Sequence, residues 1–89
     1  MKIKDGFIKR KVGDTEIVVA VGERAAEFKA MISLNGSASF IWDLLEKGTS
    51  EEALVSAMLE KYDIGKDIAE RDVRAFLEKA RSVGLLDEA

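Results

Sequence analysis

The sequence lacks cysteine, histidine and proline altogether. Without cysteine and histidine, the chain has no thiolate nucleophile, no disulfide, no zinc-finger ligand and no side chain that ordinarily titrates near neutral pH. Its seven glycines are dispersed and form neither a dinucleotide-binding nor a phosphate-binding motif. We therefore expect a protein that is not an enzyme and that holds no metal or cofactor.

Long apolar runs and an excess of positive charge are also lacking. The longest apolar run, Ile17 to Val21, is far shorter than the roughly 20 residues of a membrane span, and the N-terminal segment has no signal-peptide core. We expect a cytoplasmic protein with no membrane partner. Fourteen basic and seventeen acidic residues give a net charge of −3, which argues against a nucleic-acid partner. A basic cluster near the N-terminus is interpreted as a solvated strand face, and it consists of Lys2, Lys4, Lys9, Arg10 and Lys11.

The composition is that of one small globular domain. The 89 residues are 47% apolar and 35% charged, so we assign residues 1–89 to a single domain. Several carboxylates fall at the expected starts of helices, where the helix dipole favours negative charge: Glu51, Glu52, Asp67, Glu70 and Asp72. Their spacing does not indicate the apolar pocket that a hydrolytic pair of carboxylates needs.

The first third of the chain has the pattern of β-strands. Residues 7–12 and 15–21 are rich in β-prone side chains and flank Gly13-Asp14, which predicts a tight hairpin. Residues 22–29 are polar and predict a connection that crosses to a third strand at residues 30–34. No hairpin partner follows that third strand.

From Asn35 onward the apolar spacing is helical. Asn35 is placed to cap a first helix over about residues 36–47, which Gly48 ends. Thr49 and Glu52 form a capping-box pattern before a second helix over about residues 50–62. Asp67 has the cap spacing before a third helix over about residues 67–83.

The apolar side chains of these helices are assigned to the core. Phe40 and Trp42 lie on a helix of apolar spacing, where core packing is the usual role of an aromatic ring. The third helix has an apolar stripe made of Ala69, Val73, Phe76, Leu77 and Ala80. Leu85 and Leu86, after Gly84, are expected to fold back on that helix.

Three strands followed by three helices predict an α+β fold, a winged helix-turn-helix-like domain with a three-stranded antiparallel sheet. In a DNA-binding protein the third helix would present a cationic face. Here its basic and acidic side chains balance: Arg71, Arg74, Lys79 and Arg81 against Asp67, Glu70, Asp72 and Glu78. The charge therefore favours another ligand.

The sequence resembles the PqqD family, whose members are also called RiPP recognition elements. Three segments carry the resemblance: residues 31–48 with the Ile41-Trp42 pair, residues 49–54, and residues 72–77 followed by Gly84-Leu85-Leu86. Two features depart from the family pattern: Asn35 is followed by Gly-Ser rather than Pro-Thr or Glu-Thr, and the connection over residues 22–29 is long.

The resemblance implies a non-catalytic peptide chaperone. Such a domain captures the leader segment of a ribosomally made precursor peptide and presents it to a modifying enzyme, often a radical S-adenosylmethionine protein in a pathway like that of pyrroloquinoline quinone. The leader is understood to pair with the third strand and to rest between that strand and the third helix. An edge strand with unpaired backbone groups is a ready template for such strand addition.

The expected peptide-binding residues come from these two elements. The strand contributes Ala30, Met31, Ile32, Ser33 and Leu34, and the helix contributes Arg74, Leu77 and Arg81. Leu77 could equally serve the core, and the two arginines could be solvated.

Two other functions remain open at this point. A winged-helix DNA-binding regulator fits the topology but not the charge. A dimerisation or scaffold module could pair the same strand with its copy, or exchange it, so that the protein is either a monomer or a homodimer.

Overall fold

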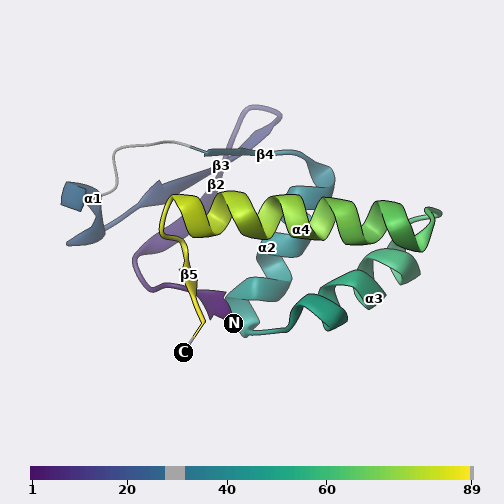
Figure 1. Ribbon diagram of the computed structural model, residues 1–89. Helices are drawn as coiled ribbons and strands as arrows, with labels where there is room; N and C mark the ends of the chain where they lie inside the picture. The colour runs from purple at the N-terminus through teal and green to yellow at the C-terminus, as the bar shows by residue number, and fades with distance from the viewer. Residues whose placement is uncertain (28–31, 89) are drawn as a thin grey trace.

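The computed structural model describes residues 1–27 and 32–88. Over these residues the chain forms the following elements in order: β1 (Lys2–Ile3), β2 (Phe7–Val12), β3 (Thr15–Ala20), α1 (Arg24–Glu27), β4 (Ile32–Leu34), α2 (Gly36–Lys47), α3 (Glu51–Lys61), α4 (Lys66–Ser82) and β5 (Leu86–Asp87). A three-stranded antiparallel sheet, β2-β3-β4, precedes the three longer helices (Figure 1), so the predicted α+β, winged helix-turn-helix-like fold is confirmed.

The predicted hairpin is present and pairs β2 with β3 from Phe7↔Ala20 to Val12↔Thr15. Gly13 in its turn has a φ of +63°, a conformation that glycine adopts without strain. The other side of β3 pairs antiparallel with β4, in the register Glu16↔Leu34, Ile17↔Ser33 and Val18↔Ile32. β4 is therefore an edge strand of this sheet. Of the predicted strand residues, 30 and 31 lie outside the described part of the chain.

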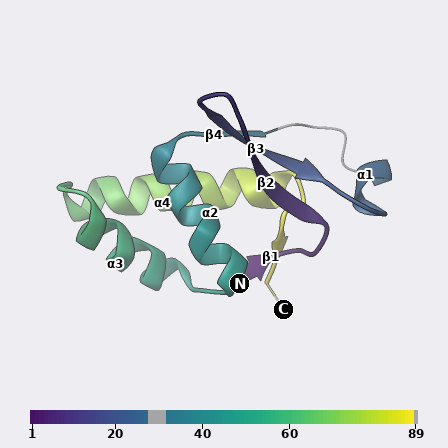
Figure 2. The same cartoon turned by 180° about the vertical axis from the view of Figure 1, so that it is seen from behind.

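One face of this sheet packs into the core. Side chains alternate between faces along a strand, and in β4 Ile32 and Leu34 are buried whereas Ser33 is exposed. Val18, directly opposite Ile32, is fully buried on the same face. In Figure 1 α4 lies in front of α2 and the sheet, and in Figure 2 it lies behind them. The inner face of β4 is thus turned toward the helical layer.

α2 begins and ends as the sequence predicts. The Asn35 side chain accepts a 2.8 Å hydrogen bond from the Ala38 N–H, which satisfies one free donor of the first turn. Gly48 follows the helix at a φ of +95° and donates its N–H to the carbonyl of Leu45. Trp42 is fully buried and donates from Nε1 to Glu46, so its core role is confirmed, while Phe40 is half-buried against the same core.

The other two predicted caps are wrong. α3 is capped by Ser50, whose hydroxyl accepts from the Ala53 N–H at 3.1 Å. Thr49 instead bonds through its backbone to Met1, with its N–H donating to the Met1 carbonyl and its carbonyl accepting from the Met1 amine. α4 begins at Lys66 after Gly65, with no side-chain cap, and Asp67 lies inside its first turn.

A second, two-stranded ladder joins the ends of the described chain and was not predicted. β1 pairs antiparallel with β5, in the register Lys2↔Asp87 and Ile3↔Leu86. Gly84, at a φ of +77°, turns the chain after α4, and the Leu85 N–H then donates to the carbonyl of Ala80 at 2.9 Å. Leu85 and Leu86 are buried, which confirms that they fold back on the helix.

The short helix α1 occupies part of the connection predicted for residues 22–29. A membrane span would require a longer and more apolar helix than any formed by residues 1–27 and 32–88.

Candidate functional site

The outer side of β4 is a candidate binding edge. Within the described residues β4 pairs only with β3, so no strand of that part of the chain covers its other side. The backbone N–H and C=O groups on an open strand edge can pair with an added strand. β2, the opposite edge of the sheet, carries Lys9, Arg10 and Lys11 in sequence, and charges of this kind discourage strand addition. β4 has the uncharged sequence Ile-Ser-Leu.

Two cavities lie along α4, one beside β4 and the other beside the start of α2. The first is a narrow apolar space of about 20 Å³, lined by Val18, Ile32, Leu34, Trp42, Phe76, Lys79, Ala80 and Leu85. The second, of about 300 Å³, continues toward the start of α2 and is lined by Asn35, Ser37, Ala38, Ile41, Asp72, Ala75, Phe76 and Lys79. Phe76 and Lys79 line both cavities, and we call the two neighbouring cavities together the β4–α4 groove.

The α4 wall of this groove is made by Asp72, Phe76 and Lys79. Residues at i, i+4 and i+7 share one face of a helix, and this face lies beside the fully buried stripe that contains Val73 and Leu77. Phe76 is only half-buried, although the sequence assigns it to the core stripe, because it stands at the boundary between the core and the groove. The groove therefore combines an open strand edge, an aromatic wall and two charged side chains.

The structure places the three predicted helix residues elsewhere. Leu77 is fully buried in the core. Arg74 lies on the α3 side of α4, where its Nη2 is 3.9 Å from Oε2 of Glu70. Arg81 donates two hydrogen bonds from Nε and one from Nη2 to the carboxylate of Glu88, at 2.8 to 3.0 Å. Neither arginine lines the β4–α4 groove.

Arg81 and Glu88 form an ion pair at the C-terminal end of α4, and this pair shifts the pKa of both side chains. The hydrogen bond to Glu88 raises the pKa of Arg81, and the hydrogen bond from Arg81 lowers the pKa of Glu88. Both side chains are nearly half-exposed, so solvent weakens this pair. Its role is to hold the residues that follow β5 against the helix.

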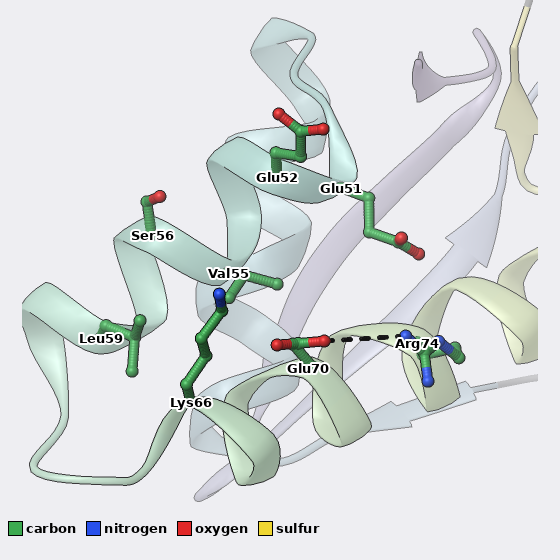
Figure 3. Close-up of a pocket in the computed structure, with 8 residues that line it drawn as sticks. All are labelled: Glu51, Glu52, Val55, Ser56, Leu59, Lys66, Glu70 and Arg74. Atoms are coloured by element: carbon green, nitrogen blue, oxygen red, sulfur yellow. Dashed lines mark ion pairs between the residues drawn. The ribbon is translucent and has the colours of Figure 1, made fainter.

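Arg74 belongs to a separate cavity between α3 and α4 (Figure 3). This cavity has a volume of about 560 Å³ and is lined by Glu51, Glu52, Val55, Ser56, Leu59, Lys66, Glu70 and Arg74. It is larger than the β4–α4 groove, but it has no strand edge beside it. We therefore place the candidate site at the groove, where backbone and side-chain recognition can act together.

The residues predicted from the sequence and those that line the groove lie on different sides of α4. At about 100° per residue, Lys79 and Arg81 lie roughly 200° apart around the helix. The charged residues on the two flanks of the buried stripe look alike in sequence, and only the position of β4 decides which flank lines the groove. A helical projection anchored on the buried residues would have grouped Phe76 with Lys79.

A polar network at the far side of β3 from this edge holds the sheet against α2. Lys9 Nζ donates to Asp43 Oδ1 at 2.6 Å and to Ser39 Oγ at 2.7 Å, and it lies 3.2 Å from Glu16 Oε2. Ser39 in turn donates to Glu16 Oε1 at 3.0 Å. Glu16 is the cross-strand neighbour of Leu34, so the network also fixes the strand to which β4 pairs.

The network also shifts the ionisation of its members. Burial lowers the pKa of Lys9, but the hydrogen bonds and charges of Asp43 and Glu16 outweigh it, so the pKa of Lys9 is raised. The hydrogen bonds from Lys9 and Ser39 lower the pKa of Glu16. Within the basic cluster, the solvated interpretation is therefore wrong for Lys9, whose side chain is only 18% exposed.

Comparison with known proteins places these features in a family context. Residues 16–86 match the family model described as coenzyme PQQ synthesis protein D (PqqD). The solved structure of TbiB1 in complex with the TbiA(beta) leader peptide has a TM-score of 0.78 and 28% sequence identity, over 100% of this chain and 98% of that chain. Lasso peptide synthetase B1 complexed with the leader peptide has a TM-score of 0.73 and 18% identity, over 94% of this chain and 93% of that chain, a likeness of fold. No curated relative matches the sequence.

Proposed function

Because the chain belongs to the PqqD family, we propose that it binds the leader segment of a ribosomally synthesised precursor peptide and presents it to a modifying enzyme. Two solved structures similar to this chain, TbiB1 and lasso peptide synthetase B1, are complexed with leader peptides, which supports a peptide ligand of this class. The proposal assigns this chain to recognition and the chemistry to its partner, for which we propose a radical S-adenosylmethionine enzyme.

The proposed mode of binding is addition of the leader as a fourth strand beside β4. The observation that carries it is the open edge of β4 next to the β4–α4 groove. Main-chain hydrogen bonds to that edge supply affinity without regard to sequence, and side-chain pockets supply selectivity. Ile32, Ser33 and Leu34 provide the described part of this edge. Ala30 and Met31 remain proposed members of it.

The groove would contact the side chain of every second residue of the leader. Alternate side chains of a strand point to the same face, so leader residues beside Ile32 and Leu34 point toward α4. There they meet Phe76 and Lys79. The residue beside Ser33 points to the opposite face of the sheet. In this arrangement Leu77 acts indirectly, because its burial holds α4 against the core.

An NMR titration with the leader peptide tests this function. We expect the largest amide shifts at Ile32, Ser33 and Leu34, and smaller shifts at Ile8 and Arg10 of the other edge strand. A peptide N-methylated on the residues that pair with β4 is the matched control, because it keeps the side chains but removes the pairing N–H donors. Undiminished binding of that peptide, or shifts confined to β2, would contradict strand addition.

A homodimer is a competing use of the same edge. An open, uncharged strand can pair with its copy in a second molecule. Measuring the mass in solution across a concentration series, with and without leader peptide, separates the two. We expect the peptide to dissociate any dimer formed through β4, since both would occupy one edge.

A further inference from the structure

We propose that the β4–α4 groove selects its peptide by charge order as well as by apolar contact, an inference that rests on the proposed function. The peptide class is an extended segment in which an apolar residue lies between a basic residue two positions before it and an acidic residue two positions after it. The observation behind this is the arrangement of Asp72, Phe76 and Lys79 along one wall of the groove.

The two charges of this wall are available to a ligand. Lys79 is exposed and forms no ion pair with any residue of the described ranges. Asp72 has Arg71 as its neighbour, with Arg71 Nε 3.6 Å from Asp72 Oδ1, but the Arg71 side chain is 73% exposed. An exposed pair of adjacent residues is weak, so a peptide cation can compete for Asp72.

Phe76 lies between Asp72 and Lys79, so the α4 wall is negative at one end, apolar in the middle and positive at the other end. Asp72 and Lys79 are seven residues apart, which is roughly 10.5 Å along a helix. Residues four apart on an added strand are separated by about 13 Å and point to the same face. Flexible lysine and glutamate side chains on the peptide readily cover the difference of about 3 Å. The middle residue of such a peptide then lies over Phe76.

The direction of β4 determines which end of an added peptide lies near Asp72 and which end lies near Lys79. The apolar cavity joins Ile32 to Ala80, and the second cavity joins Asn35 to Asp72, so β4 and α4 run in opposite directions. Figure 1 shows the same relation between the two elements. A strand added antiparallel to β4 therefore begins near Asp72 and ends near Lys79. Its basic residue must come first and its acidic residue last.

Antiparallel addition is the expected geometry here. Both existing pairings of the sheet, β2 with β3 and β3 with β4, are antiparallel. Antiparallel pairs also outnumber parallel ones two- to threefold in proteins generally. The opposite charge order in a bound peptide would thus report parallel addition.

The test is a selection from a displayed library of random 13-residue peptides against three forms of the full chain. The first form is the wild type, and the second is the groove variant Asp72→Lys with Lys79→Asp. The third is the matched control Glu70→Lys with Arg74→Glu, which exchanges charges on the other side of α4. Both double variants keep the net charge. The neutral variant Lys79→Gln provides a milder change if the groove variant does not fold.

We expect the wild type and the control to enrich the order basic, apolar, acidic at alternate positions, and the groove variant to enrich the inverse order. A selected peptide with its two charges exchanged should bind the wild type about fivefold more weakly, as expected for exposed ion pairs. That difference should disappear near 1 M salt, where the Debye length is about 3 Å.

The failures are distinguishable. Enriched peptides that shift the amides of Ile32, Ser33 and Leu34 but carry no charge order, or the same order in all three forms, overturn this inference and leave the proposed function standing. Enriched peptides with the inverse order on the wild type overturn the antiparallel reading. If no peptide of the library binds beside β4, both the inference and the proposed mode of binding are overturned.

Discussion

Lys9 on β2 donates a 2.6 Å hydrogen bond from Nζ to Oδ1 of Asp43 on α2, across 34 positions in the chain. The same ammonium group donates to Ser39, which is itself buried, and approaches Glu16 on β3. One side chain therefore connects two strands to α2, the helix that follows the candidate binding edge. Within the described residues β4 pairs only with β3, whose Glu16 belongs to this connection.

Replacing Lys9 with methionine should lower the free energy of unfolding by about 1 to 2 kcal/mol. Methionine keeps much of the apolar stem of the side chain but removes the donor, which leaves Asp43 and Glu16 without their cationic partner. Lys11→Met on the same strand is the matched control, since Lys11 is exposed, and its effect should stay within about 0.5 kcal/mol. Urea denaturation followed by circular dichroism measures both. Equal losses would show that the Lys9 network does not stabilise the fold.

Glu16 should make stability dependent on pH on the acid side. Its pKa is lowered in the folded protein from the ordinary value of 4.5, chiefly by the hydrogen bond from Lys9. The contribution is fully present above that ordinary value and is lost as the pH falls through the lowered folded pKa, because the unfolded chain takes up the proton first.

The measurement is the difference in unfolding free energy between wild type and Glu16→Gln at pH 7 and at pH 3. We expect this difference to shrink at the lower pH. In a Lys9→Met background the same comparison should change less with pH, since the main cause of the lowered pKa is gone. A difference that grows on acidification would show that folding does not lower the pKa of Glu16.

The start of α3 gives a local test. Ser50→Ala should cost about 1 kcal/mol of stability, because the serine hydroxyl accepts from the Ala53 N–H at the first turn. Thr49→Ala should cost less, since Thr49 bonds to Met1 through its backbone and keeps those bonds. Thermal or urea unfolding of the two variants checks this. A larger loss of stability in Thr49→Ala than in Ser50→Ala would indicate that Thr49 caps α3, as the capping-box pattern predicts.

Elements with strong local signals were predictable from the sequence. The β2–β3 hairpin follows from its turn residues, and α2 follows from Asn35, Gly48 and the apolar spacing between them. The capping-box pattern misplaced the cap of α3 by one residue because Thr49 and Ser50 are adjacent hydroxyl residues. Thr49 forms backbone hydrogen bonds with Met1, 48 positions away, a pairing that no local sequence pattern indicates.

The features that depend on distant pairing could not be read from local patterns. β1 and β5 have two residues each and form only because the two ends of the described chain meet. The sequence correctly assigned an edge position to the strand that includes Ile32 to Leu34. It could not show which flank of α4 faces that edge, so it favoured Arg74 and Arg81 over Phe76 and Lys79.

That difference leads to the sharpest test of the site. Phe76→Ala should weaken leader binding by about tenfold or more, because a half-buried aromatic in a groove beside a strand edge is the kind of residue that carries binding energy. Arg74→Ala, on the α3 side of the same helix, should change affinity less than twofold, as expected for an exposed side chain outside the groove. Isothermal titration calorimetry with the leader peptide measures both, and circular dichroism verifies that each variant remains folded. If Arg74→Ala weakens binding and Phe76→Ala does not, the leader lies between α3 and α4, and the β4–α4 groove is not its site.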